Sequence, residues 1–302
     1  MQKLTDSLIS VMGSENVRCN EPMNRHTTFR IGGPADWFVT PTDEKMLISA
    51  IEAIKAAQTD YCVIGNGSNL LVSDKGYRGV IIQLGEKYST IAFEGEFCSV
   101  KSGCLLSKLG MQAAARGLGG FEFATGIPGT VGGAVVMNAG AYGGEIKDCI
   151  VSARVMDADG KVSEFTKNEL MLGYRTSAVM KNNLIVLEAR FRFEKSVDYD
   201  IMEKIKELAV ARRTKQPLEY PSAGSTFKRP EGYFAGKLIQ DAGLKGYSVG
   251  GAQVSEKHSG FVINTGNATA ADVLTLVQDV QKKVYEQSGV MLEMEIRKIG
   301  EF

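Results

Sequence analysis

The sequence predicts a globular protein of about two domains that mixes helices with strands. The chain has 302 residues, a length that corresponds to roughly two domains. Its hydrophobic content of 44% is enough to bury real cores. Helical periodicity after Thr269 and strict alternation over 187–193 occur in the same chain, so both kinds of element are expected.

Composition and charge exclude several classes of protein. Lys plus Arg and Asp plus Glu both total 35, so no overall field attracts nucleic acid or an anionic membrane. The five cysteines are odd in number, scattered and without a C-x-x-C pair, which indicates neither a disulfide framework nor a zinc site. No signal-peptide core and no apolar run near the ~20 residues of a membrane helix are present, so we expect a cytoplasmic protein.

The periodicities place the elements along the chain. Helices are expected at 3–12, from a Thr42 cap through 54, at 104–116, 199–215 and 233–243, and after a capping box at Thr269–Asp272. Strands are expected at 61–64, in a hairpin that turns at Asp159–Gly160, and at 187–193, 250–254, 260–264 and 290–299. The change from strand to helix at 194–198 is the best domain boundary.

The stretch 125–145 is the densest glycine segment of the chain. Such density argues against a packed helix or strand, because glycine loses the most backbone freedom and adds no side chain to a core. Bare backbone amides can instead close around phosphate oxygens. Pro128 stiffens the first turn, and the Asn138 amide can bond a ring edge or cap the loop. The seven glycines are Gly126, Gly129, Gly132, Gly133, Gly140, Gly143 and Gly144.

A second glycine turn, 65–69, follows the strand expected at 61–64. Leu70 stands where the dinucleotide fingerprint needs its third glycine, and a strand rather than a helix follows, so a Rossmann half is excluded. The turn can still present amides and hydroxyls to a phosphate or ribityl group. Because a dinucleotide pyrophosphate commonly needs two backbone clamps, the two turns together favour a dinucleotide site.

Few side chains stand out as candidates for chemistry. Period two places Glu293, Glu295 and Arg297 on one face of the last strand, which is usually a solvated face. Ser225 follows a glycine turn, where a serine is ordinarily a cap, and Arg175 alone is a surface arginine.

The two histidines, His26 and His258, have no acidic partner at triad-like spacing, and no G-x-S-x-G motif is present. The hydrolase and zinc interpretations therefore lack support.

Seven motifs, in order, resemble one family. They are TFRIGGPAD, GNGSNLLVSD, TGIPGTVGGAVVMNAGAYGGE, GYRTS, SAGSTFKRP, HSGFVIN and LEMEIRKIG. The chain, from about residue 27 onward, is similar to UDP-N-acetylenolpyruvoylglucosamine reductases, also called UDP-N-acetylmuramate dehydrogenases. It resembles the shorter subclass, because no inserted substrate-covering loop lies between about 177 and 195. Arg229 differs from the asparagine that is common in the family.

The resemblance implies a three-lobed α+β fold. Two α+β lobes, 1–90 and 91–196, would form an FAD-binding fold of the vanillyl-alcohol-oxidase type. A C-terminal α+β lobe, 197–289, would bind substrate, and the last strand, 290–302, would return to the first lobe.

The resemblance also implies the chemistry. NADPH would give a hydride to non-covalent FAD, whose N5 would then reduce the enolpyruvyl group of UDP-N-acetylglucosamine enolpyruvate, forming UDP-N-acetylmuramate for peptidoglycan. Arg175 and Glu295 match the residues that polarise the substrate carboxylate, and Ser225 matches the proton donor. Further substrate contacts are expected from Tyr142, Lys228, Arg297 and, more weakly, His258. FAD contacts are expected from Asn66, Gly67, Ser68, Asn69, Leu70, Gly126, Ile127, Pro128, Gly129, Gly132, Gly133, Ala134, Asn138 and Gly140.

The enzyme would be an oxidoreductase acting on CH–CH with NADP as acceptor. It would need no metal, nucleic acid, membrane or oligomer. Two alternatives remain open: another FAD oxidase or dehydrogenase on the same scaffold, and a non-catalytic nucleotide-binding module. Covalent-flavin enzymes usually present a His or Cys at the attachment site, and neither glycine motif contains one. A module without turnover would leave Ser225, Arg175 and Glu295 unexplained as a set.

Overall fold

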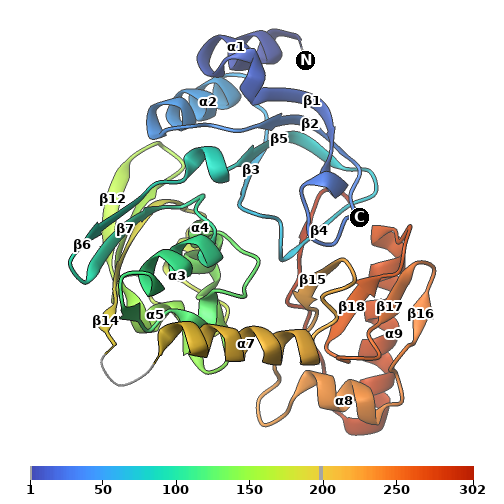
Figure 1. The fold of residues 1–302 in the computed structure, drawn as a ribbon. Coiled ribbons are helices and arrows are strands. Elements are labelled where there is room, and N and C mark those ends of the chain that lie inside the picture. Colours follow the sequence, from blue (N-terminus) through green and yellow to red (C-terminus); the bar gives the residue numbers. More distant parts are fainter. Residues whose placement is uncertain (1, 197–199) are drawn as a thin grey trace. The chain divides into compact units, whose positions relative to one another are not determined.

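The computed structural model describes residues 2–196 and 200–302 (Figure 1). The chain divides into two compact units. Unit 1 consists of Met1–Cys19, Trp37–Asn66 and Val80–Ala211, and unit 2 of Asn20–Asp36, Gly67–Gly79 and Arg212–Phe302. The boundary expected at 194–198 falls in part outside the described residues, and the division into three lobes stays a prediction.

A five-stranded antiparallel sheet dominates unit 1 (Figure 1). The hairpin expected around Asp159–Gly160 is confirmed, since Met156 pairs with Val162 and Gly160 adopts a φ of 81°. The strand order is β12 (Val162–Thr166), β11 (Ile150–Met156), β13 (Ile185–Arg192), β7 (Phe97–Lys101) and β6 (Ile91–Glu94).

The alternation predicted over 187–193 is confirmed. Leu187, Ala189, Phe191 and Phe193 are buried, whereas the intervening charged side chains are not. The Phe191 and Phe193 rings both lie 5.6 Å from the ring of Phe121. Each buried aromatic ring contributes roughly 2 to 3 kcal/mol to stability. The helices that pack with this core are α3 (Leu106–Ala114), α4 (Val131–Met137), α5 (Ile146–Cys149) and α6 (Ala178–Lys181).

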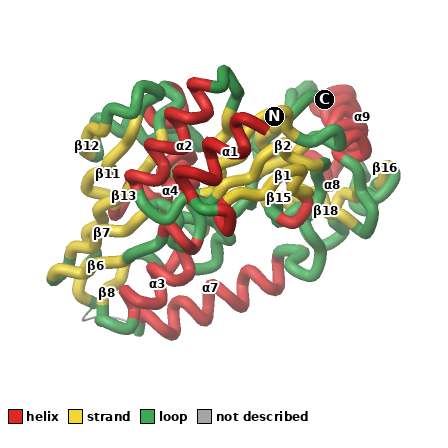
Figure 2. Tube along the Cα trace, turned by 90° about the horizontal axis from the view of Figure 1, so that it is seen from above, coloured by secondary structure: helices red, strands yellow, loops and turns green. Residues whose placement is uncertain are grey.

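A second core of unit 1 lies under α1 (Gln2–Met12) and α2 (Glu44–Ala56), which run side by side in Figure 2. The expected Thr42 cap of α2 is wrong. Asp43 has the extended backbone of an N-cap, and its Oδ1 accepts a hydrogen bond from the Met46 amide at 2.8 Å. The carboxylate, one residue later, occupies the position from which a side chain reaches the first free amides.

The strand predicted at 61–64 is confirmed as β3 (Tyr61–Ile64). It pairs in parallel with β5 (Tyr77–Gln83) in a sheet of order β1-β2-β5-β3, with β1 at Val17–Pro22 and β2 at Pro34–Val39. The unit boundaries fall inside β1, β2 and β5. The remaining short elements are β8 (Leu118–Gly119) paired with β14 (Glu194–Lys195), and 3-10 helices at Ser14–Asn16, Met23–Arg25, Glu86–Tyr88 and Glu122–Ala124.

Unit 2 packs α9 (Ala270–Ser288) against a four-stranded sheet (Figure 1). The Thr269–Asp272 capping box is confirmed, and so is the inward face of Val273, Leu276, Val277, Val280 and Val284. The sheet order is β15 (Ser222–Ser225), β18 (Phe261–Asn264), β17 (Ala252–Val254) and β16 (Ser248–Val249), and α8 spans Ala235–Asp241. The helix expected at 199–215 is α7 (Ile201–Lys215), and residue 199 lies outside the described part.

The strand expected at 290–299 is wrong in length. Only β19 (Arg297–Ile299) is a strand, and it pairs in parallel with β4 (Leu70–Val72). Residues before Arg297 lack a continuous partner strand, and Met294 forms only an isolated bridge to Phe227. The predicted alternation holds nevertheless, since Leu292 and Ile296 are buried.

No helix within 2–196 and 200–302 has both the length and the apolar content that crossing a bilayer requires.

Asp74, in the loop after β4, holds the start of α9 within unit 2. Its two carboxylate oxygens accept hydrogen bonds from the amides of Ala270 at 2.8 Å and Ala271 at 3.0 Å. Amides in the first turn of a helix have no intrahelical acceptor, so the carboxylate satisfies both.

Replacing Asp74 with alanine is expected to lower the free energy of unfolding by about 1 to 2 kcal/mol, because two helix-end amides lose their acceptor. Urea unfolding followed by circular dichroism measures the change. Lys75→Ala, at the exposed next residue, is the control and should stay within about 0.5 kcal/mol of the parent. Equal stability of the two variants would contradict the role of Asp74.

Candidate functional site

The glycine-rich stretch 125–145 contains a helix, which corrects the expectation that it cannot be packed. α4 (Val131–Met137) is capped by Thr130, whose side chain accepts from the Gly133 amide. A Cβ on Gly132 would lie 2.8 Å from the Cβ of Ser102, and the Gly132 amide donates to the Ser102 carbonyl at 2.8 Å. Glycine is therefore used here for close packing of a helix.

The turn that precedes α4 leaves two backbone amides without an acceptor in the described chain, and its predicted binding of an anion stays a prediction. Within the described residues, the amides of Gly126 and Gly129 donate to no chain acceptor, and Gly126 and Pro128 are exposed. Free amides beside a helix start suit a phosphate group.

The structure brings the two glycine turns together in unit 1. The side-chain amide of Asn66 donates to the carbonyl of Pro128 at 2.7 Å. A Cβ on Gly65 would lie 2.2 Å from Oγ1 of Thr130, so only glycine fits at the end of β3. The hydrogen bond of Asn66 and the close approach of Gly65 to Thr130 thus join the first half of the 65–69 turn to the 128–130 segment.

The Asn138 amide caps the loop, which is the second of the two roles expected for it. It is fully buried, ends α4 in the left-handed conformation, and uses its whole amide inside the loop. Its Nδ2 donates to Glu145 Oε2 at 2.9 Å and to the Gly173 carbonyl at 3.1 Å, and its Oδ1 accepts from the Lys147 amide at 2.9 Å. Its expected contact with a cofactor stays a prediction.

Tyr142 and Arg175 lie at the tips of two tight turns in unit 1. Tyr142 and Gly143, with φ values of 52° and 88°, join β9 (Gly140–Ala141) to β10 (Gly144–Glu145). Positive φ at both central residues is typical of a type I′ hairpin turn. Arg175, with a φ of 53°, lies in the turn between Gly173 and Thr176, which form an isolated bridge.

Glu145 is the main anionic group beside these turns. Its Oε2 lies 2.7 Å from Nζ of Lys147. The hydrogen bond from Lys147 holds the pKa of the Glu145 carboxyl below its usual range, and the Asn138 amide and the Arg175 charge act in the same direction. Glu145 is therefore ionised at neutral pH and faces positive charge.

In unit 2, Ser225 and Glu295 lie on adjacent extended segments. The Glu295 amide donates to the Thr226 carbonyl at 2.8 Å, and the Lys228 amide donates to the Glu293 carbonyl at 2.8 Å. The Lys228 ammonium also lies 2.8 Å from the Glu293 carboxylate. Backbone pairing thus fixes the register between the Ser225 and Glu295 segments.

The second half of the 65–70 turn is bonded to the same segment. The Arg297 amide donates to the Asn69 carbonyl at 3.0 Å, and Nδ2 of Asn69 donates to the Glu295 carbonyl at 3.2 Å. Gly67 has a φ of +63°, and a Cβ there would lie 2.0 Å from the His26 carbonyl. The predicted cofactor residues 67–70 and the predicted acid therefore form one rigid group in unit 2.

His258 lies beside the strand that pairs with the Ser225 strand. Its Nδ1 accepts from the Gly260 amide at 3.1 Å, and its ring packs edge-on against Phe261, the residue paired with Ser225. Burial lowers the pKa of the His258 imidazole. The ring is therefore neutral at pH 7, with its remaining proton on Nε2.

The acidic partner of His26 was missed by sequence reasoning. Nε2 of His26 lies 2.8 Å from Oε1 of Glu21, and both side chains are only 13% exposed. A spacing of five residues across the end of β1 resembles no catalytic motif, so only coordinates reveal the pair. The pair lies close in sequence to Thr28, whose amide donates to the Gly67 carbonyl at 3.3 Å.

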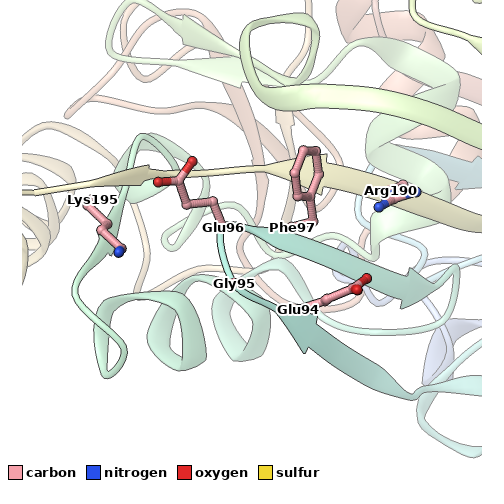
Figure 3. A pocket seen from close by; sticks show the side chains of 6 residues that line it. All are labelled: Glu94, Gly95, Glu96, Phe97, Arg190 and Lys195. Atoms are coloured by element: carbon pink, nitrogen blue, oxygen red, sulfur yellow. The ribbon is translucent and has the colours of Figure 1, made fainter.

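A pocket of about 500 Å³ lies elsewhere in unit 1, at the hairpin between β6 and β7 (Figure 3). Its lining charges are engaged locally, since Arg190 stacks 4.8 Å from the Phe97 ring and Glu96 pairs with Arg192 at 3.6 Å. It shares no residue with the predicted site. The lining residues are Glu94, Gly95, Glu96, Phe97, Arg190 and Lys195.

The predicted residues therefore fall into two groups. Unit 1 holds Asn66, the 126–140 segment, Tyr142 and Arg175. Unit 2 holds Gly67, Ser68, Asn69, Leu70, Ser225, Lys228, His258, Glu295 and Arg297.

Comparisons with known proteins cover almost the whole chain. Residues 35–166 match the FAD binding domain family, and residues 216–299 match the C-terminal domain of UDP-N-acetylenolpyruvoylglucosamine reductase. The UDP-N-acetylenolpyruvoylglucosamine reductase of Alkaliphilus oremlandii is 52% identical over 299 residues, covering 99% of this chain and 98% of that relative. The corresponding reductase of Lachnoclostridium phytofermentans is 53% identical over 302 residues, covering 99% and 97%.

Solved structures give the same result. The crystal structure of the Thermus caldophilus reductase superposes with a TM-score of 0.80 at 37% identity, covering 94% of this chain and 98% of that one. Alkyldihydroxyacetonephosphate synthase shares the fold alone, with a TM-score of 0.51 at 14% identity over 65% of this chain and 41% of that one. The α+β fold class, with an FAD-binding fold of the vanillyl-alcohol-oxidase type, is confirmed. The shorter connection is confirmed too, since only residues 182–184 separate α6 from β13.

Replacing Gly67 with alanine is expected to lower the free energy of unfolding by about 3 kcal/mol or more, because the new methyl group meets the His26 carbonyl in addition to the backbone strain. Gly243→Ala is the matched control, with a φ of +69° and open space around a Cβ. It should cost only about 1 to 2 kcal/mol. Urea unfolding measures the free energy of unfolding of both variants. Equal losses of stability would contradict a close approach at Gly67.

Proposed function

Since the chain belongs to the UDP-N-acetylenolpyruvoylglucosamine reductase family, we propose that it is an FAD-dependent reductase of peptidoglycan precursor synthesis. Its substrate is UDP-N-acetylglucosamine enolpyruvate, its product is UDP-N-acetylmuramate, and NADPH is the hydride donor. In enzyme terms it is an oxidoreductase acting on CH–CH with NADP as acceptor. The observation that carries the proposal is the backbone pairing that holds Ser225 and Glu295 on neighbouring segments, with Asn69 bonded to the second.

The residues around the glycine turns fit non-covalent FAD. Free amides at Gly126 and Gly129, next to Asn66, suit the pyrophosphate, and Cβ atoms on Gly65 or Gly132 would collide with the chain. When bound, FAD supplies the hydride chemistry, because its flavin accepts a hydride from NADPH and passes one to the β-carbon of the enolpyruvyl group. Residues 67–70, in unit 2, are proposed to contact FAD as well.

Arg175 and Glu295 are proposed to bind the carboxylate of the enolpyruvyl group. During reduction of the β-carbon, negative charge develops on the α-carbon and this carboxylate. The Arg175 guanidinium neutralises this negative charge, and Glu295 shares a proton with the substrate carboxylate. Fixed donors of this kind are commonly worth about 3 to 4 kcal/mol of barrier each.

Ser225 is proposed to donate the proton to the α-carbon. A hydroxyl is a weak acid, so donation requires a strongly basic carbanion held against it. The pairing of Ser225 with Phe261 and of its neighbour Thr226 with Glu295 restrains the backbone that carries the hydroxyl. A fixed donor avoids reorganisation during the proton transfer.

The charged residues around this centre are proposed to bind the rest of the sugar nucleotide. Tyr142, Lys228 and Arg297 would contact it, and neutral His258 would donate from Nε2. Lys228 is paired with Glu293, and this pairing holds the pKa of the Glu293 carboxyl below its usual range. A substrate phosphate that binds Lys228 must therefore replace the Glu293 carboxylate. The replacement costs little free energy, because the ion pair is exposed.

The setting that we propose is the cytoplasm, where NADPH and nucleotide sugars are available. No nucleic acid, membrane or oligomeric partner is needed for the reaction.

Purified protein tests the function. It should be yellow with a flavin that acid releases, and in the absence of oxygen its consumption of NADPH beyond the one equivalent that reduces the flavin should require UDP-N-acetylglucosamine enolpyruvate. A colourless protein that binds no FAD, or NADPH consumption that ignores the sugar, would refute the proposal.

Ser225→Ala is expected to leave flavin reduction by NADPH near the parent rate and to slow the second half-reaction by several orders of magnitude, because only that half needs the proton. Stopped-flow absorbance separates the two halves. Ser222→Ala, on the same strand, is the control and should resemble the parent in both. Equal damage to both halves would reject Ser225 as the proton donor.

A further inference from the structure

The buried amide of Asn138 joins two turns of unit 1 that are far apart in sequence. One of its Nδ2 hydrogen bonds goes to the Glu145 carboxylate, in the hairpin that carries Tyr142. The other goes to the Gly173 carbonyl, at the base of the turn that carries Arg175. A single fully buried side chain therefore sets the distance between the two turns.

The Arg175 turn is tight. Arg175 itself has a φ of 53°, which costs a non-glycine residue free energy, and two backbone hydrogen bonds join Gly173 and Thr176 across the turn. Its two ends are held on α4. The Asn138 amide holds Gly173, and the Ser177 hydroxyl donates to the Val136 carbonyl at 2.7 Å.

Glu145 fixes the orientation of Asn138. Nδ2 of Asn138 donates one hydrogen to the Gly173 carbonyl and the other to Glu145 Oε2, so both hydrogens have an acceptor in this orientation. The Lys147 backbone amide, two residues after Glu145, holds the Oδ1 side. Without the carboxylate, a buried donor would be left unsatisfied, and rotation of the amide would release Gly173.

We propose that Glu145, acting through Asn138, is the positioning residue that holds the Arg175 turn and the Tyr142 hairpin in register for substrate binding. This inference rests on the proposed function of Arg175 and Tyr142. Glu145 itself touches neither substrate nor cofactor in this scheme. The Arg175 charge also acts on the Glu145 carboxyl and lowers its pKa, which shows that the two charges lie near each other.

Three variants of the full-length, FAD-loaded protein test the inference. Glu145→Ala removes the acceptor, Glu145→Gln keeps an acceptor oxygen for Asn138 but removes the charge, and Lys147→Met removes only the ion pair. For each variant, the dissociation constant of the enolpyruvyl sugar is measured from the flavin difference spectrum of the oxidised protein. Steady-state kcat and KM and the affinity of the apoprotein for FAD are measured beside it.

Glu145→Ala should weaken sugar binding and lower kcat/KM by about 100-fold, the cost of a displacement near 1 Å at a reacting group. Its affinity for FAD should stay within threefold of the parent, on the order of ordinary surface changes. Glu145→Gln should recover to within about fivefold, and Lys147→Met should match the parent within about twofold.

Three results would overturn the inference. They are unchanged sugar binding in Glu145→Ala, an equal loss of FAD and sugar affinity in that variant, and failure of Glu145→Gln to recover. Parent protein that does not turn over the sugar would instead refute the proposed function, and the two failures are thus distinguishable.

Discussion

The backbone pairing between the Ser225–Lys228 segment and the 293–297 segment is the constraint on which the site of unit 2 depends. The Glu295 amide is bonded to Thr226, its carbonyl to Asn69, and the Arg297 amide to the Asn69 carbonyl. These bonds connect three parts of the chain, around residues 69, 225 and 295. The segments that carry Ser225, Glu295 and Asn69 are therefore bonded to one another within unit 2. These bonds use the backbone of Glu295 and Arg297 and not their side chains, whereas Asn69 contributes its side-chain amide to one of them.

Glycine serves two different purposes in the chain. At 126 and 129 it leaves amides without partners in the described chain, as a phosphate requires. At Gly132 it allows α4 to approach the Ser102 backbone, and at Gly67 it allows a left-handed turn under the His26 carbonyl.

Much of the fold was predictable from the sequence, because local rules agree with the tertiary structure there. Alternation identified the buried side of β13, and the capping box identified the start of α9. The failures have physical causes. The helix α4 was not predicted, because its glycines allow close packing against neighbours that the sequence does not reveal. The last strand was predicted too long, because extended residues without a partner strand show the same alternation as a strand. The contacts of Glu145 with Asn138 and of Glu21 with His26 join residues seven and five positions apart across turns, a spacing that matches no motif, so only the folded turns reveal them.

An anaerobic flavin absorbance experiment on the parent protein tests the central claim most directly. We predict that NADPH bleaches the bound flavin and that UDP-N-acetylglucosamine enolpyruvate, added afterwards without oxygen, restores the colour while UDP-N-acetylmuramate forms. A flavin that stays bleached after the sugar is added would contradict the account.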